Sequence, residues 1–174
     1  MASSLNYKII FLLVINVYLF VTTNATPTLL EKVCNKTRDI AFCLNVFGAD
    51  PATRTASLSE LGQITIDKST DKASKTKADI NKRLFFASDP ELKNVLTQCL
   101  HAYDDALAAL RIAPDDLRKA HYMDLYRHAN DAGQGATACE QSFIDNSLPS
   151  PLTNDNLQLS NYCNIIQIIA NASW

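Results

Sequence analysis

Four side chains that could bind a metal ion follow one another at helical spacing in the second half of the chain. His121, Asp124, His128 and Asp131 are separated by steps of three, four and three residues, which places them on one face of a helix. Two imidazoles and a carboxylate could hold a transition metal. A row of this kind is more often a solvated face opposite a buried stripe of alanines. We expect this row to be a solvated helix face of that kind, so the sequence predicts no metal site. His101 is likewise expected to be a surface histidine.

The acidic residues do not form a catalytic pair. Asp104-Asp105 and Asp115-Asp116 are neighbours in sequence, and neighbours on a helix point in different directions. The sequence contains no Gly-x-Ser-x-Gly, His-Glu-x-x-His or Cys-x-x-Cys motif and no phosphate-binding glycine loop. We therefore expect a binding protein, without catalytic or cofactor-binding residues, rather than an enzyme.

The composition favours a helical protein. The chain has 174 residues, of which 47% are hydrophobic and 20% are charged, as in a single globular domain. Its net charge of -2 without any basic cluster argues against nucleic-acid binding. Four glycines are too few for the turns of an all-β fold, so an all-α fold is the default expectation.

The N-terminus has the pattern of a secretory signal peptide. An apolar run extends from Ile9 to Val21, and the small residues Thr23 and Ala25 occupy the two positions that a signal peptidase reads. We predict that residues 1–25 are removed by cleavage after Ala25. The alternative is a retained membrane anchor, which is disfavoured because no basic flank follows the apolar run.

Secretion would allow the five remaining cysteines to form disulfides and would leave one unpaired. Apolar residues recur in two stretches at alternating steps of three and four, which is typical of helices buried in a bundle. The two series are Leu92, Leu96, Cys99, Tyr103, Ala106 and Leu110, and Tyr122, Leu125, Ala129, Ala132, Ala136, Cys139 and Phe143. Each series contains one cysteine, so we predict a Cys99–Cys139 bridge between antiparallel helices. The alternative is a pair of buried thiols.

Capping residues, glycines and prolines divide the rest of the chain into helices. The helices expected outside the two series cover about 27–36, 39–47, 55–86 and 157–169, the last being the most buried. In the helix that begins after Ser88-Asp89-Pro90, we expect a kink or a broken last turn at Pro114-Asp115-Asp116. The chain should then reverse at Arg118 to His121, since Cys99 and Cys139 are equidistant from that point.

Cys163 and two glycosylation sequons lie outside these series. Cys163 falls in the predicted last helix and is expected to be a packed free thiol, the alternative being a handle for intermolecular pairing. Asn35 and Asn171 begin Asn-x-Ser/Thr sequons and are candidate glycosylation sites.

Several short segments, taken in order, make the chain similar to the plant invertase and pectin methylesterase inhibitor family over essentially all of 27–171. They include Val33-Cys34-Asn35-Lys36-Thr37-Arg38, Phe42-Cys43-Leu44, Asp50-Pro51, Leu61-Gly62-Gln63-Ile64-Thr65-Ile66-Asp67, Asp89-Pro90-Glu91-Leu92-Lys93, Tyr103-Asp104-Asp105-Ala106, Ala138-Cys139-Glu140-Gln141-Ser142-Phe143 and the lone Cys163. The resemblance implies an all-α, up-and-down four-helix bundle at 49–174 that follows a helical hairpin at 26–48. It also implies two disulfides, Cys34–Cys43 and Cys99–Cys139.

The resemblance further implies a secreted inhibitor that covers the substrate cleft of a cell-wall or vacuolar carbohydrate-active enzyme. Family members that inhibit invertase carry Pro-Lys-Phe where this chain has Tyr122-Met123-Asp124. We expect acid invertase as the target, with pectin methylesterase or a non-inhibitory pollen or cell-wall protein as alternatives. The contact residues expected from this are Asp104, Asp105, Tyr122, Met123 and Asp124. The protein is expected to be extracellular, as a monomer or a dimer that exchanges hairpins.

Overall fold

The computed structural model describes residues 27–48 and 51–172, and the predicted signal peptide lies outside this part of the chain. The elements are α2 (Leu29–Cys34), α3 (Ile40–Gly48), the 3-10 helix η1 (Pro51–Thr55), α4 (Leu58–Phe86), α5 (Pro90–Arg118), α6 (Tyr122–Asp145) and α7 (Thr153–Ala170). The described residues form no strand. The predicted all-α fold is therefore confirmed.

The long helices begin where polar side chains cap their first backbone N–H groups. Ser57 caps α4: its backbone N–H donates to Glu60 Oε2 at 2.7 Å, and its hydroxyl accepts from the Glu60 N–H at 3.3 Å. Asp89 accepts from the Leu92 N–H at 2.8 Å and caps α5, with Pro90 as the first residue of the helix.

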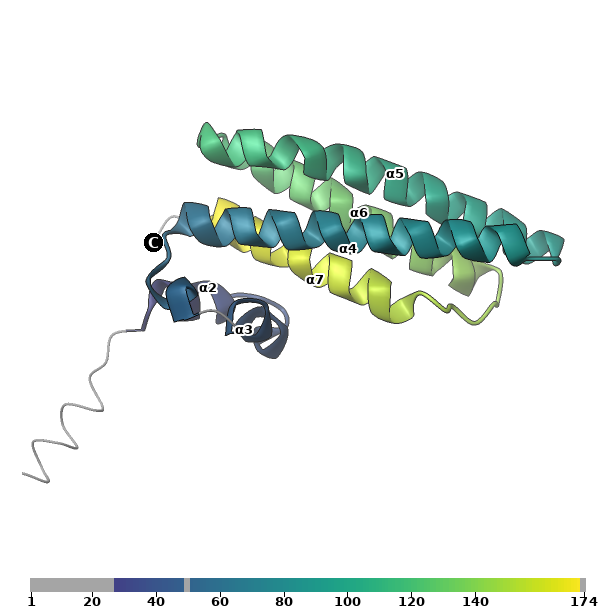
Figure 1. The fold of residues 1–174 in the computed structure, drawn as a ribbon, viewed down its shortest axis with the longest axis horizontal. Coiled ribbons are helices and arrows are strands. Elements are labelled where there is room, and N and C mark those ends of the chain that lie inside the picture. Colours follow the sequence, from purple (N-terminus) through teal and green to yellow (C-terminus); the bar gives the residue numbers. More distant parts are fainter. Residues whose placement is uncertain (1–26, 49–50, 173–174) are drawn as a thin grey trace, which may run out of the picture.

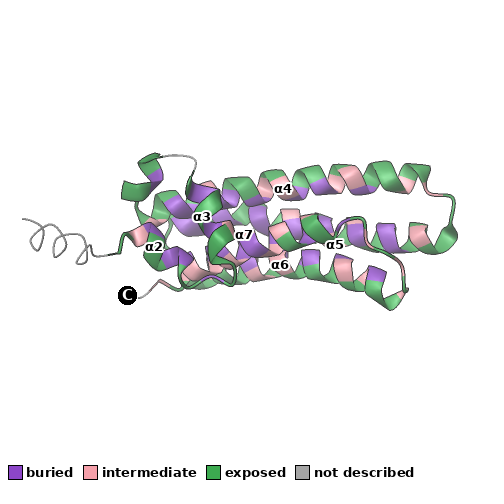
Figure 2. Ribbon diagram, turned by 90° about the horizontal axis from the view of Figure 1, so that it is seen from below, coloured by how far each residue is buried: buried purple, intermediate pink, exposed green. Residues whose placement is uncertain are grey.

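Helices α4 to α7 form an up-and-down bundle in which each helix packs antiparallel to the next, and α7 closes on α4 (Figure 1). Their inner faces make one core, which Figure 2 shows as buried stripes along the helices. The largest buried side chains of this core include Ile66, Ile80, Leu96, Tyr103, Leu110, Leu125, Phe143 and Leu159. The two predicted series face this core, except that Tyr122 is 48% exposed.

Helix α4 has a weak sequence pattern because part of its buried face is polar. Thr65, Ser69 and Thr76 are buried, and each hydroxyl donates to a carbonyl three or four residues earlier in the helix at 2.8 to 2.9 Å. A hydroxyl bonded in this way can be buried without an unpaired donor. The helix is therefore packed along its length despite having few apolar residues in its middle.

Both predicted disulfides are present. Cys34 and Cys43 join α2 to α3 with a Cα–Cα distance of 5.4 Å, and Cys99 and Cys139 join α5 to α6 with a distance of 4.4 Å. Cys163 is an unpaired, buried thiol on α7. Burial raises the pKa of Cys163 to about 12, against a smaller lowering by Arg38. Its burial agrees with the prediction of a packed core thiol.

The helix is not broken at Pro114, because α5 continues without interruption to Arg118. The prediction of a broken last turn at this proline is therefore wrong. The packing of Ala113 and Leu117 in the core keeps this last turn helical although proline removes one backbone donor. The reversal then occurs at 119–121, as predicted, with Ala120 in the left-handed conformation at φ 56°.

The hairpin of α2 and α3 packs against α7 and the start of α4, at the end of the bundle where α5 turns into α6 (Figure 1). A second apolar cluster fills this junction and contains Leu30, Val33, Phe47, Leu61, Ile165 and Ile169. The Arg38 N–H donates to Asn164 Oδ1 at 2.9 Å, and the rings of Phe42 and Tyr162 meet edge to face at 4.9 Å. Among the described helices, none combines the length and hydrophobicity needed to cross a membrane.

Candidate functional site

The five predicted contact residues fall into two groups rather than one patch. Asp104 and Asp105 lie in the middle of α5, whereas Tyr122, Met123 and Asp124 form the first turn of α6. Arg118, at the end of α5, is thirteen positions after Asp105, which is about 20 Å along a helix at 1.5 Å per residue. A partner that contacts one group does not automatically contact the other.

The α5 group is only partly free to meet a partner. Asp104 forms an ion pair with Lys77 of α4, and the two side chains are 52% and 32% exposed. Asp105 is exposed on the same helix. Since Lys77 neutralises much of the charge of Asp104, Asp105 is the stronger candidate for an acidic contact from this helix.

The α6 group protrudes at the corner between α5 and α6. Met123 is 76% exposed and Tyr122 is 48% exposed, so the corner presents apolar surface to solvent. Asp124 is bound by Arg127, whose Nη2 lies 2.7 Å from its Oδ1. Exposed large side chains on a rigid turn are the kind of group that fills a pocket on a partner.

The same corner between α5 and α6 also holds a group of polar residues that we call the corner cluster: Asp116, His121, Asp124 and His128. Asp116 is buried in the last turn of α5, and its Oδ2 lies 2.6 Å from His128 Nδ1 on α6. One ligand atom from each of Asp116, His121 and Asp124 lies within 4.8 Å of the other two. Asp131, the last member of the predicted row, is exposed and is not in the cluster.

Asp116 is the cluster member that is not predicted as a site residue from the sequence. From the sequence, Asp115-Asp116 is interpreted only as a pair of neighbouring acidic residues that does not form a catalytic pair, although the series of α5 continues from Leu110 through Ala113 and reaches Asp116 three residues later. The position of Asp116 in this apolar series indicates that its side chain faces inward. His128 was assigned to a solvated face, whereas it turns towards Asp116 and is about one-fifth exposed.

Glu140 on α6 is held in a network that joins α6 to α7. Its carboxylate accepts hydrogen bonds from Ser150 at 2.9 Å, Thr153 at 2.6 Å and Asn156 at 2.7 Å. Asn156 in turn accepts a bond from the Tyr103 hydroxyl at 2.8 Å. Partial burial alone would raise the pKa of Glu140, but the three hydrogen bonds together lower it. This carboxylate is a structural anchor rather than a poised acid.

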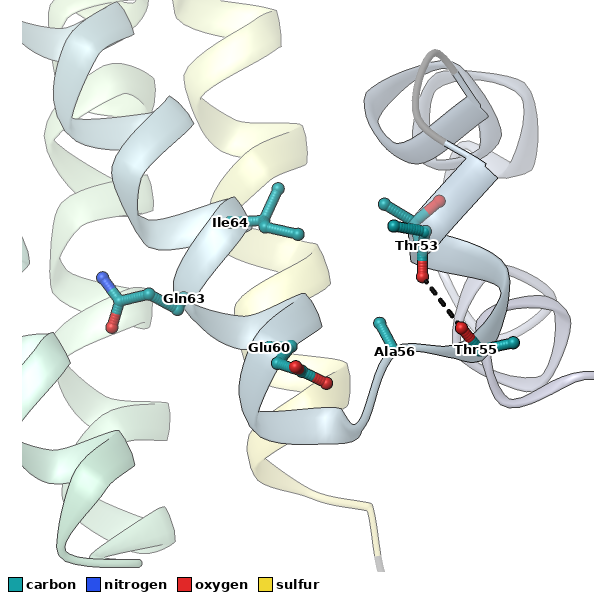
Figure 3. Close-up of a pocket in the computed structure, with 7 residues that line it drawn as sticks. Thr53, Thr55, Ala56, Glu60, Gln63 and Ile64 are labelled. Carbon is teal, nitrogen blue, oxygen red and sulfur yellow. Dashed lines mark hydrogen bonds between the residues drawn. The ribbon is translucent and has the colours of Figure 1, made fainter.

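A surface pocket of about 420 Å³ lies between η1 and the first turns of α4 (Figure 3). It is lined by Ala52, Thr53, Thr55, Ala56, Glu60, Gln63 and Ile64. Glu60 supplies the one carboxyl group among the lining residues. Hydrogen bonds from the backbone and side chain of Ser57 lower the pKa of Glu60. That carboxylate is committed to capping α4, so the pocket resembles a groove between elements more than a reaction site.

The fold and these surfaces define a disulfide-linked helical bundle whose candidate binding residues lie on its outer surface. The sequence model of the family described as plant invertase/pectin methylesterase inhibitor matches residues 28–172, and the chain belongs to this family.

Individual relatives agree with this assignment. A protein from Actinidia deliciosa named Pectinesterase inhibitor is 32% identical over 151 residues, which cover 86% of this chain and 82% of the relative. A protein from Arabidopsis thaliana named Cell wall / vacuolar inhibitor of fructosidase 1 is 30% identical over 77% of this chain and 65% of the relative. The crystal structure of a mutant form of a pectin methylesterase inhibitor from Arabidopsis superposes with a TM-score of 0.74 at 25% identity, covering 84% of this chain and 97% of the other.

Proposed function

We propose that this protein inhibits a plant carbohydrate-active enzyme by covering its substrate cleft with the outer surface of the bundle. The observation that carries the proposal is the corner at the start of α6, where Tyr122 and Met123 are exposed on a turn that the bundle holds rigidly. A surface that is already ordered loses little entropy on docking. Membership in a family of enzyme inhibitors supports this reading.

Acid invertase is the first candidate target and pectin methylesterase is the second. Resemblance to the fructosidase inhibitor of Arabidopsis supports the first, and resemblance to the pectinesterase inhibitor of Actinidia supports the second. The test is inhibition of both purified enzymes at mildly acidic pH by the mature protein. Inhibition of neither enzyme at micromolar concentration would contradict the proposal and favour the non-inhibitory alternative.

The two groups of predicted contacts allow the binding face to be mapped. If the corner enters the cleft, Met123→Ala should weaken inhibition by about tenfold, because it removes an exposed apolar anchor. The matched control is Ile144→Ala, since Ile144 is 61% exposed at the far end of the same helix. If the α5 face binds instead, Asp105→Asn should weaken inhibition, whereas Met123→Ala should have no effect.

Secretion and glycosylation are part of the same proposal. Asn35 is exposed at the end of α2 and Asn171 is exposed at the end of α7, so both positions could carry a glycan on the folded protein. N-terminal sequencing of protein secreted by plant cells should begin at Thr26, and glycosidase treatment should reduce its mass. Retention of residues 1–25 would contradict the cleavage prediction.

We further propose that the protein is a monomer. The hairpin buries Val33 and Phe47 against its own bundle, so exchange between copies is not needed to cover them. Light scattering of the mature protein should give the mass of one chain. A dimeric mass that persists on dilution would favour hairpin exchange instead.

A further inference from the structure

The corner cluster is built by the backbone as well as by its side chains. The His121 N–H donates to the Asp116 carbonyl at 2.8 Å and closes the turn after α5. Asp124 follows in the first turn of α6, whose start this turn sets. Three side chains from two helices and their connection are therefore attached to one rigid corner.

Asp116 is the least exposed member of the cluster. The residue is 7% exposed, and His128 contacts one of its two oxygens, at 2.6 Å. A largely buried carboxylate requires compensating partners. A hydrogen bond between an outer imidazole and a ligating carboxylate is also the arrangement that orients ligands in metal sites.

The donor set selects a class of cation. An imidazole with two carboxylates suits zinc, copper or nickel, whereas magnesium and calcium prefer oxygen ligands alone. Ligand atoms around a tetrahedral zinc lie about 3.4 Å apart, given zinc–ligand distances of about 2.0 to 2.1 Å. The cluster atoms lie within 4.8 Å of one another, and the exposed His121 can rotate inwards to close this difference.

One interaction competes with metal binding. Arg127 binds Asp124 Oδ1 at 2.7 Å, and the two side chains are 64% and 46% exposed. Exposed ion pairs are weak and readily exchanged. A divalent cation can therefore displace the guanidinium from this carboxylate.

We propose that Asp116, His121 and Asp124 form a binding site for a late transition-metal dication such as zinc, with His128 as a positioning residue. The site joins the end of α5 to the start of α6. It does not depend on the proposed inhibitory function.

The first test is calorimetric titration of zinc chloride into the untagged mature protein. The expected result is one saturable site per chain, together with a higher Tm in zinc. His121→Ala should weaken binding at least tenfold, and His101→Ala should leave it unchanged, because His101 is an exposed histidine in the middle of α5. No saturable binding up to millimolar zinc, or equal binding by His121→Ala, would overturn the proposal.

The second test uses the competing ion pair and does not depend on loss of a ligand. Arg127→Ala frees Asp124 and should tighten zinc binding several-fold. Arg118→Ala removes an equal charge from the same corner, but the partner of Arg118 is Asp115, which Lys119 also contacts, so this variant measures the general effect of charge. Equal tightening by both variants would argue against coordination by Asp124.

The third test separates positioning from coordination. His128→Gln should weaken zinc binding by about 10- to 100-fold, as loss of an outer hydrogen bond typically does. Magnesium chloride in tenfold excess should not compete with zinc at this site. Competition by magnesium would show that the cluster is a general acidic site and would overturn the assignment.

Discussion

At the scale of single residues, two helix ends of the bundle use a left-handed residue that is not glycine. Ala120 follows α5 with a φ of 56°, and Ser147 follows α6 with a φ of 53°. In each case the next N–H bonds back five residues, from His121 to Asp116 and from Leu148 to Phe143. This is the Schellman arrangement, in which glycine is the usual residue.

We therefore expect Ala120→Gly to stabilise the protein. The left-handed conformation costs an L-residue about 1 to 2 kcal/mol, and glycine avoids this cost while losing part of the gain to its unfolded-state entropy. The expected net gain is about 0.5 to 1 kcal/mol, measured by urea unfolding. Ser147→Gly should behave alike, and Ala138→Gly, in the interior of α6, should instead destabilise the protein. A destabilising Ala120→Gly would contradict this account.

Glu140 makes the second prediction at this scale. Glu140→Gln leaves one acceptor oxygen for the three donors of Ser150, Thr153 and Asn156, so it should cost about 1 to 3 kcal/mol at pH 7. Because hydrogen bonds keep the pKa of Glu140 in the folded protein below its usual value, the carboxylate adds stability above the pKa of the unfolded chain and loses this contribution as the pH falls through the folded pKa.

The pH dependence supplies the control for this prediction. Stability of the wild-type protein measured between pH 6 and 3 should fall more steeply than that of Glu140→Gln. Glu91→Gln, which alters an exposed carboxylate on α5, should retain the wild-type slope. Parallel curves for wild type and Glu140→Gln would show that the network does not perturb this carboxylate.

At the scale of elements, the close contact between α5 and α6 depends on Gly135. A Cβ built at this position would lie 2.5 Å from the backbone oxygen of Ala102 and 3.1 Å from the Cβ of Ala106. The backbone cannot move aside as a flexible side chain can. Glycine inside α6 is therefore explained by packing, which outweighs its low helix propensity.

Gly135→Ala should consequently destabilise the protein by about 1 to 3 kcal/mol, the usual cost of overpacking. Gly48→Ala is the matched control, because among the described residues no atom outside its chain neighbours and its own helix backbone lies within 4 Å of the added Cβ, and its φ is not positive. That variant should be neutral or stabilise by up to about 1 kcal/mol. Thermal unfolding of the two variants measures the difference, and similar Tm values for both would refute the packing argument.

Much of the element order could be predicted from the sequence. The alternating series placed α5 and α6 and their bridge, and the capping residues Ser57 and Asp89 mark the starts of α4 and α5. The 3-10 helix at Pro51–Thr55 was not predicted, since a single short turn has no periodicity. The persistence of α5 beyond Pro114 was missed because packing, not local preference, decides it.

At the scale of the whole molecule, the two disulfides constrain loops of different length. Their sequence separations are 40 residues for Cys99–Cys139 and 9 for Cys34–Cys43. Chain-entropy reasoning gives stabilisations of about 4 and about 2.6 kcal/mol, respectively.

Replacing Cys99 and Cys139 by alanine should therefore lower the free energy of unfolding more than replacing Cys34 and Cys43. Denaturant unfolding of both double variants measures the difference. A larger loss from the hairpin bridge would mean that docking of the hairpin, rather than loop entropy, dominates its contribution.

The sequence by itself determined the order of the α-helices, the Cys99–Cys139 bridge and the family, because helical period, caps and motif order are local properties of the chain. Only the tertiary structure decided that Asp116 meets His128, that Glu140 meets the start of α7, and that the five predicted contacts separate into two groups. These relations depend on the rotation and axial register of one helix against another. Packing of the core sets both, and no single segment encodes them.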